Sequence, residues 1–179
     1  MRKLASRALA LAAALMAAGA ALGAEKFEED ARIARGRYLV TVMDCGGCHT
    51  PGALVGQRDA QRTLAGSEVG FGGSAPMGEM TGGVVFPGNL TPDAETGLGR
   101  WSEAEIVRAL RQGLRPDGRA LVPVMPWPAF QQLTDEDASA IAAYLKNLPP
   151  VRNAVPANVP PDQTSPAPYL KVVRDGTGG

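Results

Sequence analysis

Two cysteines and one histidine form the part of the sequence that is best suited to chemistry. They stand together as Cys45-Gly46-Gly47-Cys48-His49, and the chain contains no other cysteine or histidine. Two thiols at this spacing can add to the two vinyl groups of one haem, and a histidine directly after the second thiol can bind the iron. The pattern therefore predicts one covalently attached haem c, with Cys45 and Cys48 as its attachment points and His49 as an iron ligand.

Other kinds of site also use a pair of cysteines. A structural zinc site needs four ligands, usually two such pairs or a pair with two histidines, and the sequence lacks them. A redox-active dithiol is expected beside a βαβ pattern, which this sequence does not show. A structural disulfide is compatible with an exported protein, but it leaves the adjacent histidine unexplained. We favour haem and keep the disulfide as the alternative.

The second axial ligand of the iron must be of another type, because the single histidine is already assigned. Methionine is the natural candidate, since a thioether stabilises ferrous iron. Met125 lies in the run Pro123-Val124-Met125-Pro126-Trp127-Pro128, where prolines fix the backbone and are expected to exclude a helix, so that an axial side chain would be held in place. Met77 and Met80, in a glycine-rich loop, are the alternatives. We expect His49 and Met125 to hold the metal.

The first of the predicted helices leads into the cysteine motif. Residues 25–30 are acidic and suit a helix start, and the helix is expected to run from about Asp30 to Met43. Its apolar face, at the helical spacing, consists of Gly36, Leu39, Val40 and Met43, which makes Met43 a core residue rather than a ligand. Gly36 costs about 1 kcal/mol relative to alanine in a helix, so it indicates either the close approach of a second helix or a tolerated defect.

Two further helices are predicted after a glycine-rich loop over residues 51–99, which has short strand-like pieces around residues 84–86. The second helix should begin at Ser102, in a capping box with Glu105, and stop at Gly113. The third should be capped by Thr134 and end before the prolines at 149 and 150. The expected apolar faces are Val107, Leu110 and Leu114, with Ile106 and Ala109 beside them, and Ile141, Tyr144, Leu145 and Leu148. These patterns predict an all-α fold with about three core helices around the haem.

The two ends of the chain differ from the expected single domain over residues 24–151. Residues 1–23 combine early positive charges with an apolar, alanine-rich run, as in a signal peptide; a retained membrane anchor is the alternative. Their removal leaves 15 basic and 18 acidic residues, which disfavours nucleic acid as a partner, and leaves no segment apolar enough to span a bilayer. Residues 152–179 are rich in proline and predict an extended tail that lies on the domain or on a partner.

The sequence resembles the class I cytochrome c family, and more narrowly the cytochrome subunits of periplasmic dehydrogenases that act on alcohols, sugars or aldehydes. Between Arg32 and Val151 the resemblance is carried by the haem motif, Asn89–Asp93, Gly97–Trp101, Arg115–Gly118 and Met125-Pro126. It implies the class I cytochrome c fold, in which the first and last helices cross near Gly36 and Tyr144 and a methionine loop closes the haem crevice. Met125-Pro126 matches the ligand motif of the family. Such relatives often carry three haem domains, whereas this chain has one.

The resemblance implies electron transfer rather than catalysis. One electron at a time would pass in the periplasm from a dehydrogenase donor to a cytochrome or oxidase acceptor, and in a membrane-associated complex the tail would make the permanent contact. Trp101 would donate its indole N–H to a haem propionate or only pack before the helix cap, and Arg100 and Arg119 would neutralise propionates or be solvated. The alternative function is small-molecule binding or peroxide chemistry at an open iron position, which the absence of a second histidine disfavours.

Overall fold

The computed structural model describes residues 2–72 and 83–171 of the 179-residue chain. The elements in chain order are α1 (Arg2–Val42), α2 (Cys45–His49), the short 3₁₀ helices η1 (Ala53–Val55) and η2 (Ala60–Arg62), β1 (Gly70–Phe71), α4 (Glu103–Gln112), α5 (Trp127–Phe130), α6 (Asp135–Lys146) and β2 (Tyr169–Leu170). The regular elements of the described part are therefore helices, apart from two strands of two residues each, as the sequence predicted.

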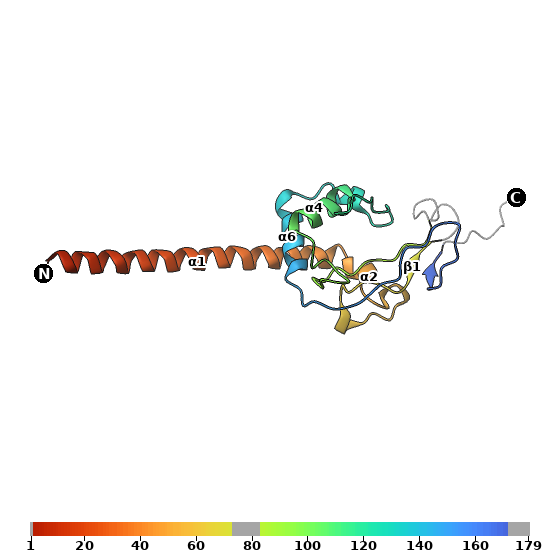
Figure 1. Cartoon of the computed structure of the whole chain (residues 1–179), viewed down its shortest axis with the longest axis horizontal. Helices are drawn as coiled ribbons and strands as arrows, with labels where there is room; N and C mark the ends of the chain where they lie inside the picture. Colours follow the sequence, from red (N-terminus) through yellow and green to blue (C-terminus); the bar gives the residue numbers. More distant parts are fainter. Residues whose placement is uncertain (1, 73–82, 172–179) are drawn as a thin grey trace.

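Helix α1 is much longer than the sequence suggested. The predicted start near Asp30 is wrong, because the helix runs without interruption from Arg2 through the acidic residues 25–30. In Figure 1 its N-terminal part projects from the domain as a single rod, and its C-terminal part packs against α6. Among residues 2–72 and 83–171, no helix combines the length and the apolar character that a membrane span requires.

Helices α1 and α6 cross in close contact at Gly36. A Cβ atom added there would lie 1.9 Å from the backbone oxygen of Ala140 and 2.8 Å from the Cβ of Tyr144. Ion pairs stand beside the crossing: Arg35 Nε lies 2.8 Å from an oxygen of Asp137, and Arg32 Nη1 lies 2.8 Å from one of Glu103. The prediction of a close helix approach is confirmed, and the interpretation of Gly36 as a tolerated defect is wrong.

Helices α4 and α6 begin where their capping residues predicted. The capping box between Ser102 and Glu105 is complete, Thr134 caps α6, and Gly113 ends α4 in the left-handed conformation at φ 64°. The inward stripe of α4 differs from the expected one. Leu114 is 36% exposed, because it follows the helix end at Gly113 and no longer shares its face. The buried residues that join the helices into one core are Leu39, Val40, Leu64, Leu98, Ile106, Leu110, Ile141, Ala142 and Leu145.

The C-terminal segment lies on the domain. Strand β2 pairs in parallel with β1, with Gly70 opposite Tyr169 and Phe71 opposite Leu170. Val84 pairs with Val159 in an isolated bridge, as the expected strand-like piece around residues 84–86 suggested. In Figure 1 this pairing lies on the side of the domain opposite the start of α1. Over residues 152–171 the tail is thus extended, as predicted, but it carries a short strand.

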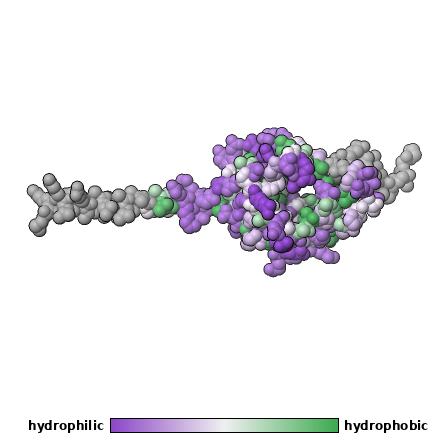
Figure 2. Space-filling model, in the orientation of Figure 1, coloured by the Kyte–Doolittle hydropathy of each residue, from purple (hydrophilic) through white to green (hydrophobic). Residues whose placement is uncertain are grey.

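The described surface is mixed in character. On the face shown in Figure 2, hydrophilic residues prevail and apolar residues occur in small separate areas. The large apolar side chains that remain exposed are spread along the chain, although Tyr38 and Val42 are one helical turn apart and Tyr169 and Leu170 are adjacent. They are Leu22, Phe27, Tyr38, Val42, Val55, Leu114, Tyr169 and Leu170. These positions do not by themselves define a binding surface.

Replacing Gly36 by alanine is expected to destabilise the domain although alanine favours helices. The added methyl group meets backbone atoms of α6 that cannot rotate away, so the overpacking cost of about 1–3 kcal/mol exceeds the gain in helix propensity of about 1 kcal/mol. Denaturant unfolding of the purified protein measures this change. Arg37→Ala, at the exposed neighbouring position of α1, is the control and should unfold at the wild-type midpoint. An equally stable Gly36→Ala protein would show that the two helices do not meet there.

Candidate functional site

The cysteine motif forms a short helix of its own. Helix α1 ends at Val42, Asp44 takes the left-handed conformation at φ 48°, and α2 then covers Cys45 to His49. The predicted end of the first helix near Met43 is confirmed to within one residue, and the positive φ of Asp44 changes the chain direction in front of the motif. Both thiols and the imidazole therefore lie on one short helix, which follows α1 after two residues.

The two thiols are not joined to each other in the structure. Cys45 and Cys48 are both free and half-buried. Burial is the main reason that the pKa of the Cys45 thiol rises to about 11, and it also raises the pKa of Cys48, with the charge of Asp44 adding to both effects. At neutral pH each sulfur therefore carries its proton. This state is suited to addition across a vinyl group and differs from the disulfide alternative.

The imidazole of His49 is held by a backbone carbonyl. Its Nδ1 lies 2.7 Å from the oxygen of Gly88, which can only accept, so Nδ1 carries the proton and donates. Burial lowers the pKa of His49, and the hydrogen bond to Gly88 opposes this only in part. The ring is consequently neutral near pH 7, with the lone pair of Nε2 available. A metal-bound histidine uses this tautomer and this kind of hydrogen-bond support.

Two more contacts fix the backbone on either side of His49. The carbonyl oxygen of His49 accepts a hydrogen bond from the N–H of Gly66 at 2.8 Å. The hydroxyl oxygen of Thr50, which is fully buried, accepts one from the N–H of Leu64 at 3.0 Å. Sequence reasoning missed Gly66, Gly88 and Thr50, since nothing in the local pattern shows which distant loop meets the histidine.

Met125 lies in a loop that is anchored on α4. It is half-buried and packs against the same apolar core as Cys45 and Trp101. Helix α5 begins at Trp127 and includes Pro128, so the expectation that the prolines exclude a helix is wrong beyond Pro126; Met125 itself precedes the helix. Proline fits there because the first residues of a helix need no N–H partner.

Trp127 fixes the loop that carries Met125 in place. The indole Nε1 of Trp127 donates to the carbonyl of Leu121 at 3.1 Å, and its ring fills the space where a Cβ at Gly113 would stand, 2.6 Å away. The N–H of Trp127 donates to the carbonyl of Met125 at 2.7 Å. Met43 packs against the core, as predicted, while Met77 and Met80 lie outside the described residues.

Trp101 is half-buried at the edge of the core, with a cation above its ring. The guanidinium carbon of Arg115 lies 5.3 Å from the ring centroid. The ammonium of Lys146 on α6 donates to three carbonyls of the turn that carries the tryptophan, at 3.3 Å for Leu98, 2.9 Å for Gly99 and 2.8 Å for Trp101. The position of Trp101 is therefore set by α6 as well as by its own helix cap.

Two arginines in the described part of the chain offer hydrogen-bond donors that have no acceptor. The Nε atoms of Arg108 and Arg115 are buried and make no hydrogen bond, although Arg115 Nε lies 3.6 Å from a carboxylate oxygen of Asp117. The sequence had pointed to Arg119 and Arg100 instead. Arg119 donates to Asp117 at 2.7 Å, a contact that is the main reason the pKa of Asp117 falls to about 2, and Arg100 is exposed.

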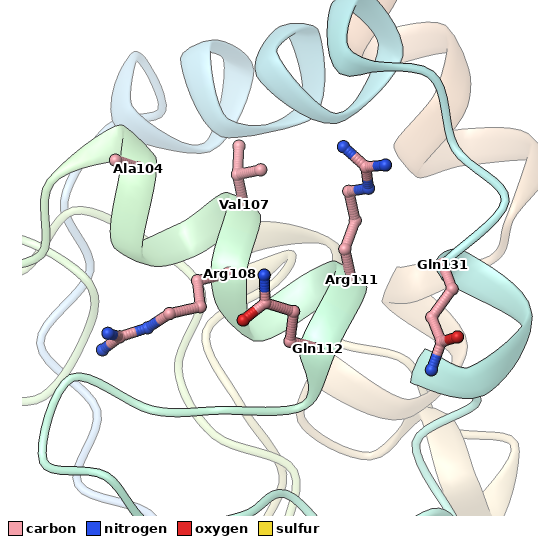
Figure 3. A pocket seen from close by; sticks show the side chains of 6 residues that line it. All are labelled: Ala104, Val107, Arg108, Arg111, Gln112 and Gln131. Carbon is pink, nitrogen blue, oxygen red and sulfur yellow. The ribbon is translucent and has the colours of Figure 1, made fainter.

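A pocket beside α4 does not involve the predicted site residues. Figure 3 shows its lining side chains, from Ala104, Val107, Arg108, Arg111, Gln112 and Gln131. Arg108 and Arg111 leave the helix in different directions, and Arg111 pairs with Asp135 at the start of α6. The pocket holds neither a thiol nor an imidazole, so we do not assign it to the chemistry of the motif.

These features fit a covalently bound haem. Two protonated thiols, a neutral imidazole with an open Nε2, a half-buried thioether and two donors that lack an acceptor match the vinyl groups, the iron and the propionates of one such group. Among residues 2–72 and 83–171, no three histidine, cysteine, aspartate or glutamate side chains gather as a metal site.

Comparison with known proteins decides the family. The family model for cytochrome c matches residues 33–149, which is most of the chain. The chain belongs to the cytochrome c family. Its class I fold and its likeness to dehydrogenase cytochrome subunits, inferred above from the motifs, are confirmed. Membership implies a covalently bound haem c and supports electron transfer as the function of this cytochrome.

The relatives are much longer proteins. A subunit of the nicotinate dehydrogenase of Pseudomonas putida is 38% identical over 72% of this chain and 10% of its own length. The fructose dehydrogenase cytochrome subunit of Gluconobacter japonicus is 41% identical over 63% of this chain and 20% of its own length. The cytochrome c subunit of the quinone-dependent alcohol dehydrogenase of Gluconacetobacter polyoxogenes is 38% identical over 74% of this chain and 25% of its own length. This chain thus spans no more than about a quarter of any of the three.

Proposed function

We propose that this cytochrome carries a single haem and passes one electron at a time between a dehydrogenase and a respiratory acceptor in the periplasm. The observation that carries the proposal is the hydrogen bond of 2.7 Å between His49 Nδ1 and Gly88, which leaves one neutral imidazole prepared for iron directly beside the sequence's one pair of thiols. A single motif provides for a single haem, whereas a relative of Cereibacter sphaeroides is named a dihaem cytochrome.

Each site residue has one role in this proposal. Cys45 and Cys48 would form the thioether links to the haem, and His49 and Met125 would hold its iron. When bound, haem supplies an iron couple that takes up and releases one electron. The chain places His49 on helix α2 and Met125 directly before helix α5, so both side chains would be held by ordered backbone and would need little rearrangement on a change of iron charge. The apolar core against which Cys45 and Met125 pack would keep water away from the iron.

The propionate groups would meet Trp101 and the two arginines. A carboxylate is a strong acceptor for a buried guanidinium Nε, and Arg108 and Arg115 each present one such donor. Arg115 also stacks on Trp101, so a propionate bound there would be held beside the indole N–H. We propose these two arginines in place of Arg100 and Arg119, because among the described residues Arg108 and Arg115 are the arginines whose buried Nε has no hydrogen-bond partner.

The location and the partners follow from the ends of the chain and from the relatives. Residues 1–23 are proposed as a cleaved signal peptide, which would leave α1 beginning in the acidic stretch at residues 25–30. The relatives are named as subunits of dehydrogenases for nicotinate, fructose and alcohol, so we propose a dehydrogenase as the donor and a cytochrome or oxidase as the acceptor. The mature chain carries 18 acidic against 15 basic residues, which favours protein partners over nucleic acid.

A redox titration of the full-length protein, matured by its host, tests the proposal. One haem with two protein ligands is expected to give a single wave that fits a one-electron Nernst curve, because one iron changes its charge by one. The reduced protein should also resist rapid binding of carbon monoxide, since both axial positions are filled. Two waves would contradict the single haem. Rapid carbon monoxide binding would favour the alternative function at an open iron position.

Replacement of Met125 by alanine tests the sixth ligand. The ferric spectrum is expected to lose its sulfur-to-iron band and the reduction potential to fall, because a thioether favours ferrous iron over the water or hydroxide that would replace it. Absorption spectroscopy and spectroelectrochemistry measure both. Met43→Ala is the matched control, since Met43 packs against the same core and should lose stability while keeping the band. A Met125→Ala protein that keeps the band would assign the ligand elsewhere, with Met77 and Met80 as the next residues to replace.

A further inference from the structure

We infer that the segment from Val151 to Val159 positions the histidine side of the site, by holding in place the two loops whose backbone groups fix His49. The inference rests on the proposed role of His49 as an iron ligand. It gives the beginning of the proline-rich tail a function inside the domain, where the sequence suggested contact with a partner.

His49 is fixed by two loops that lack regular structure of their own. Gly88 receives its Nδ1 proton at 2.7 Å, and Gly66 donates to its carbonyl at 2.8 Å. The loops are bound to each other: the N–H of Leu90 donates to the carbonyl of Leu64 at 2.9 Å, and that of Ser67 to the carbonyl of Pro87 at 3.0 Å. Since neither loop is a helix or a regular strand, their positions depend on what packs against them.

The far end of the segment holds the residues just before Gly88. Val84 and Val159 exchange two backbone hydrogen bonds, of 2.9 Å from the N–H of Val84 and 2.8 Å from that of Val159. The side-chain oxygen of Asn158 accepts from the N–H of Phe86 at 3.0 Å. Phe86 is 8% exposed and stands two residues before the carbonyl that His49 uses. A shift of this stretch would therefore reach Gly88 directly.

The near end of the segment holds the residues just after Gly88. The amide of Asn89 donates to the carbonyl of Val151 at 2.7 Å, and the N–H of Val151 donates to the hydroxyl oxygen of Thr91 at 3.1 Å. The Thr91 hydroxyl in turn donates to the side-chain oxygen of Asn89 at 2.8 Å. Asn89 and Thr91 are 3% and 1% exposed, so these bonds have no competing water, and breaking one would leave a buried polar group unpaired.

The middle of the segment holds the other loop. The amide of Asn153 donates to the carbonyl of Ala65 at 2.8 Å, directly before Gly66. The side chain of Val155 lies against Gly66 itself, where an added Cβ would come within 2.4 Å of Val155 Cγ1. The segment thus touches both loops at the residues next to the two groups that bind His49.

The consequence for the site is electronic as well as geometric. A carbonyl that accepts from Nδ1 makes the imidazole a stronger ligand and fixes the plane of its ring. Hydrogen-bond strength depends steeply on distance and angle, so a small displacement of Gly88 would weaken this support. A weaker ligand favours ferrous over ferric iron, and loosening the segment should therefore raise the reduction potential.

Two substitutions of Asn158 test the inference in the full-length haem protein. Asn158→Ala removes the acceptor for Phe86, and is expected to shift the reduction potential to a more positive value and to speed the exchange of the His49 Nδ1 proton with solvent, seen by NMR. Asn158→Asp keeps an oxygen that can accept from Phe86, so the His49 Nδ1 proton should exchange slowly again. The added negative charge would move the reduction potential to a more negative value, opposite to the shift expected for Asn158→Ala. Asn153→Ala, which frees Ala65, should act like Asn158→Ala.

Asn147→Ala is the matched control. The side-chain amide of Asn147 donates to the carbonyl of Ala143 at the end of α6, and none of the hydrogen bonds that Asn147 makes within the described residues reaches the two loops. Its loss should therefore lower the stability of the fold without changing the reduction potential or the exchange of the His49 proton. A reduction potential and a proton-exchange rate equal to those of the wild type, in both Asn158→Ala and Asn153→Ala, would overturn the inference. So would failure of both variants to accumulate while the control does, because the segment would then be only structural. A wild-type chain that carries no haem would instead overturn the proposed function.

Discussion

The hydrogen bond between His49 and Gly88 is the interaction on which the rest of the site depends. It joins α2, which carries the thiols, to a loop almost forty residues later in the chain, and it decides which nitrogen of the ring bears the proton. Without an acceptor at Nδ1, a buried neutral imidazole could present either nitrogen to the metal. The loop that carries this carbonyl is itself held by hydrogen bonds to residues 64–67 and to the segment from Val151 to Val159.

The helices provide the frame for this interaction, and they were the part most open to prediction. Ser102, Glu105 and Thr134 indicated where α4 and α6 begin, because capping depends on residues close in sequence. Gly36 indicated the approach of α6 to α1, since only a residue without a side chain fits against the Ala140 carbonyl. The cysteine motif predicted the cofactor class for the same reason: its chemistry lies within five adjacent residues.

The loops and the C-terminal segment could not be predicted in the same way. The partners Asn89 and Val151 are 62 residues apart, and no local pattern marks such a pair. Leu64 takes a positive φ of 63° in the buried core, a conformation unfavourable for leucine that only the surrounding contacts impose. Local rules also failed at element ends: Leu114 kept the helical spacing but lies past the end of α4, and prolines around Met125 did not prevent α5.

The mass of the mature polypeptide tests the central claim most directly. Purified from a host that is competent in haem attachment and then denatured, the chain should have the mass of the polypeptide plus one haem, because thioether bonds to Cys45 and Cys48 survive denaturation. The double variant Cys45→Ala, Cys48→Ala from the same host gives the reference mass without attachment. A wild-type chain of unmodified mass, or one that carries two haems, would contradict the account.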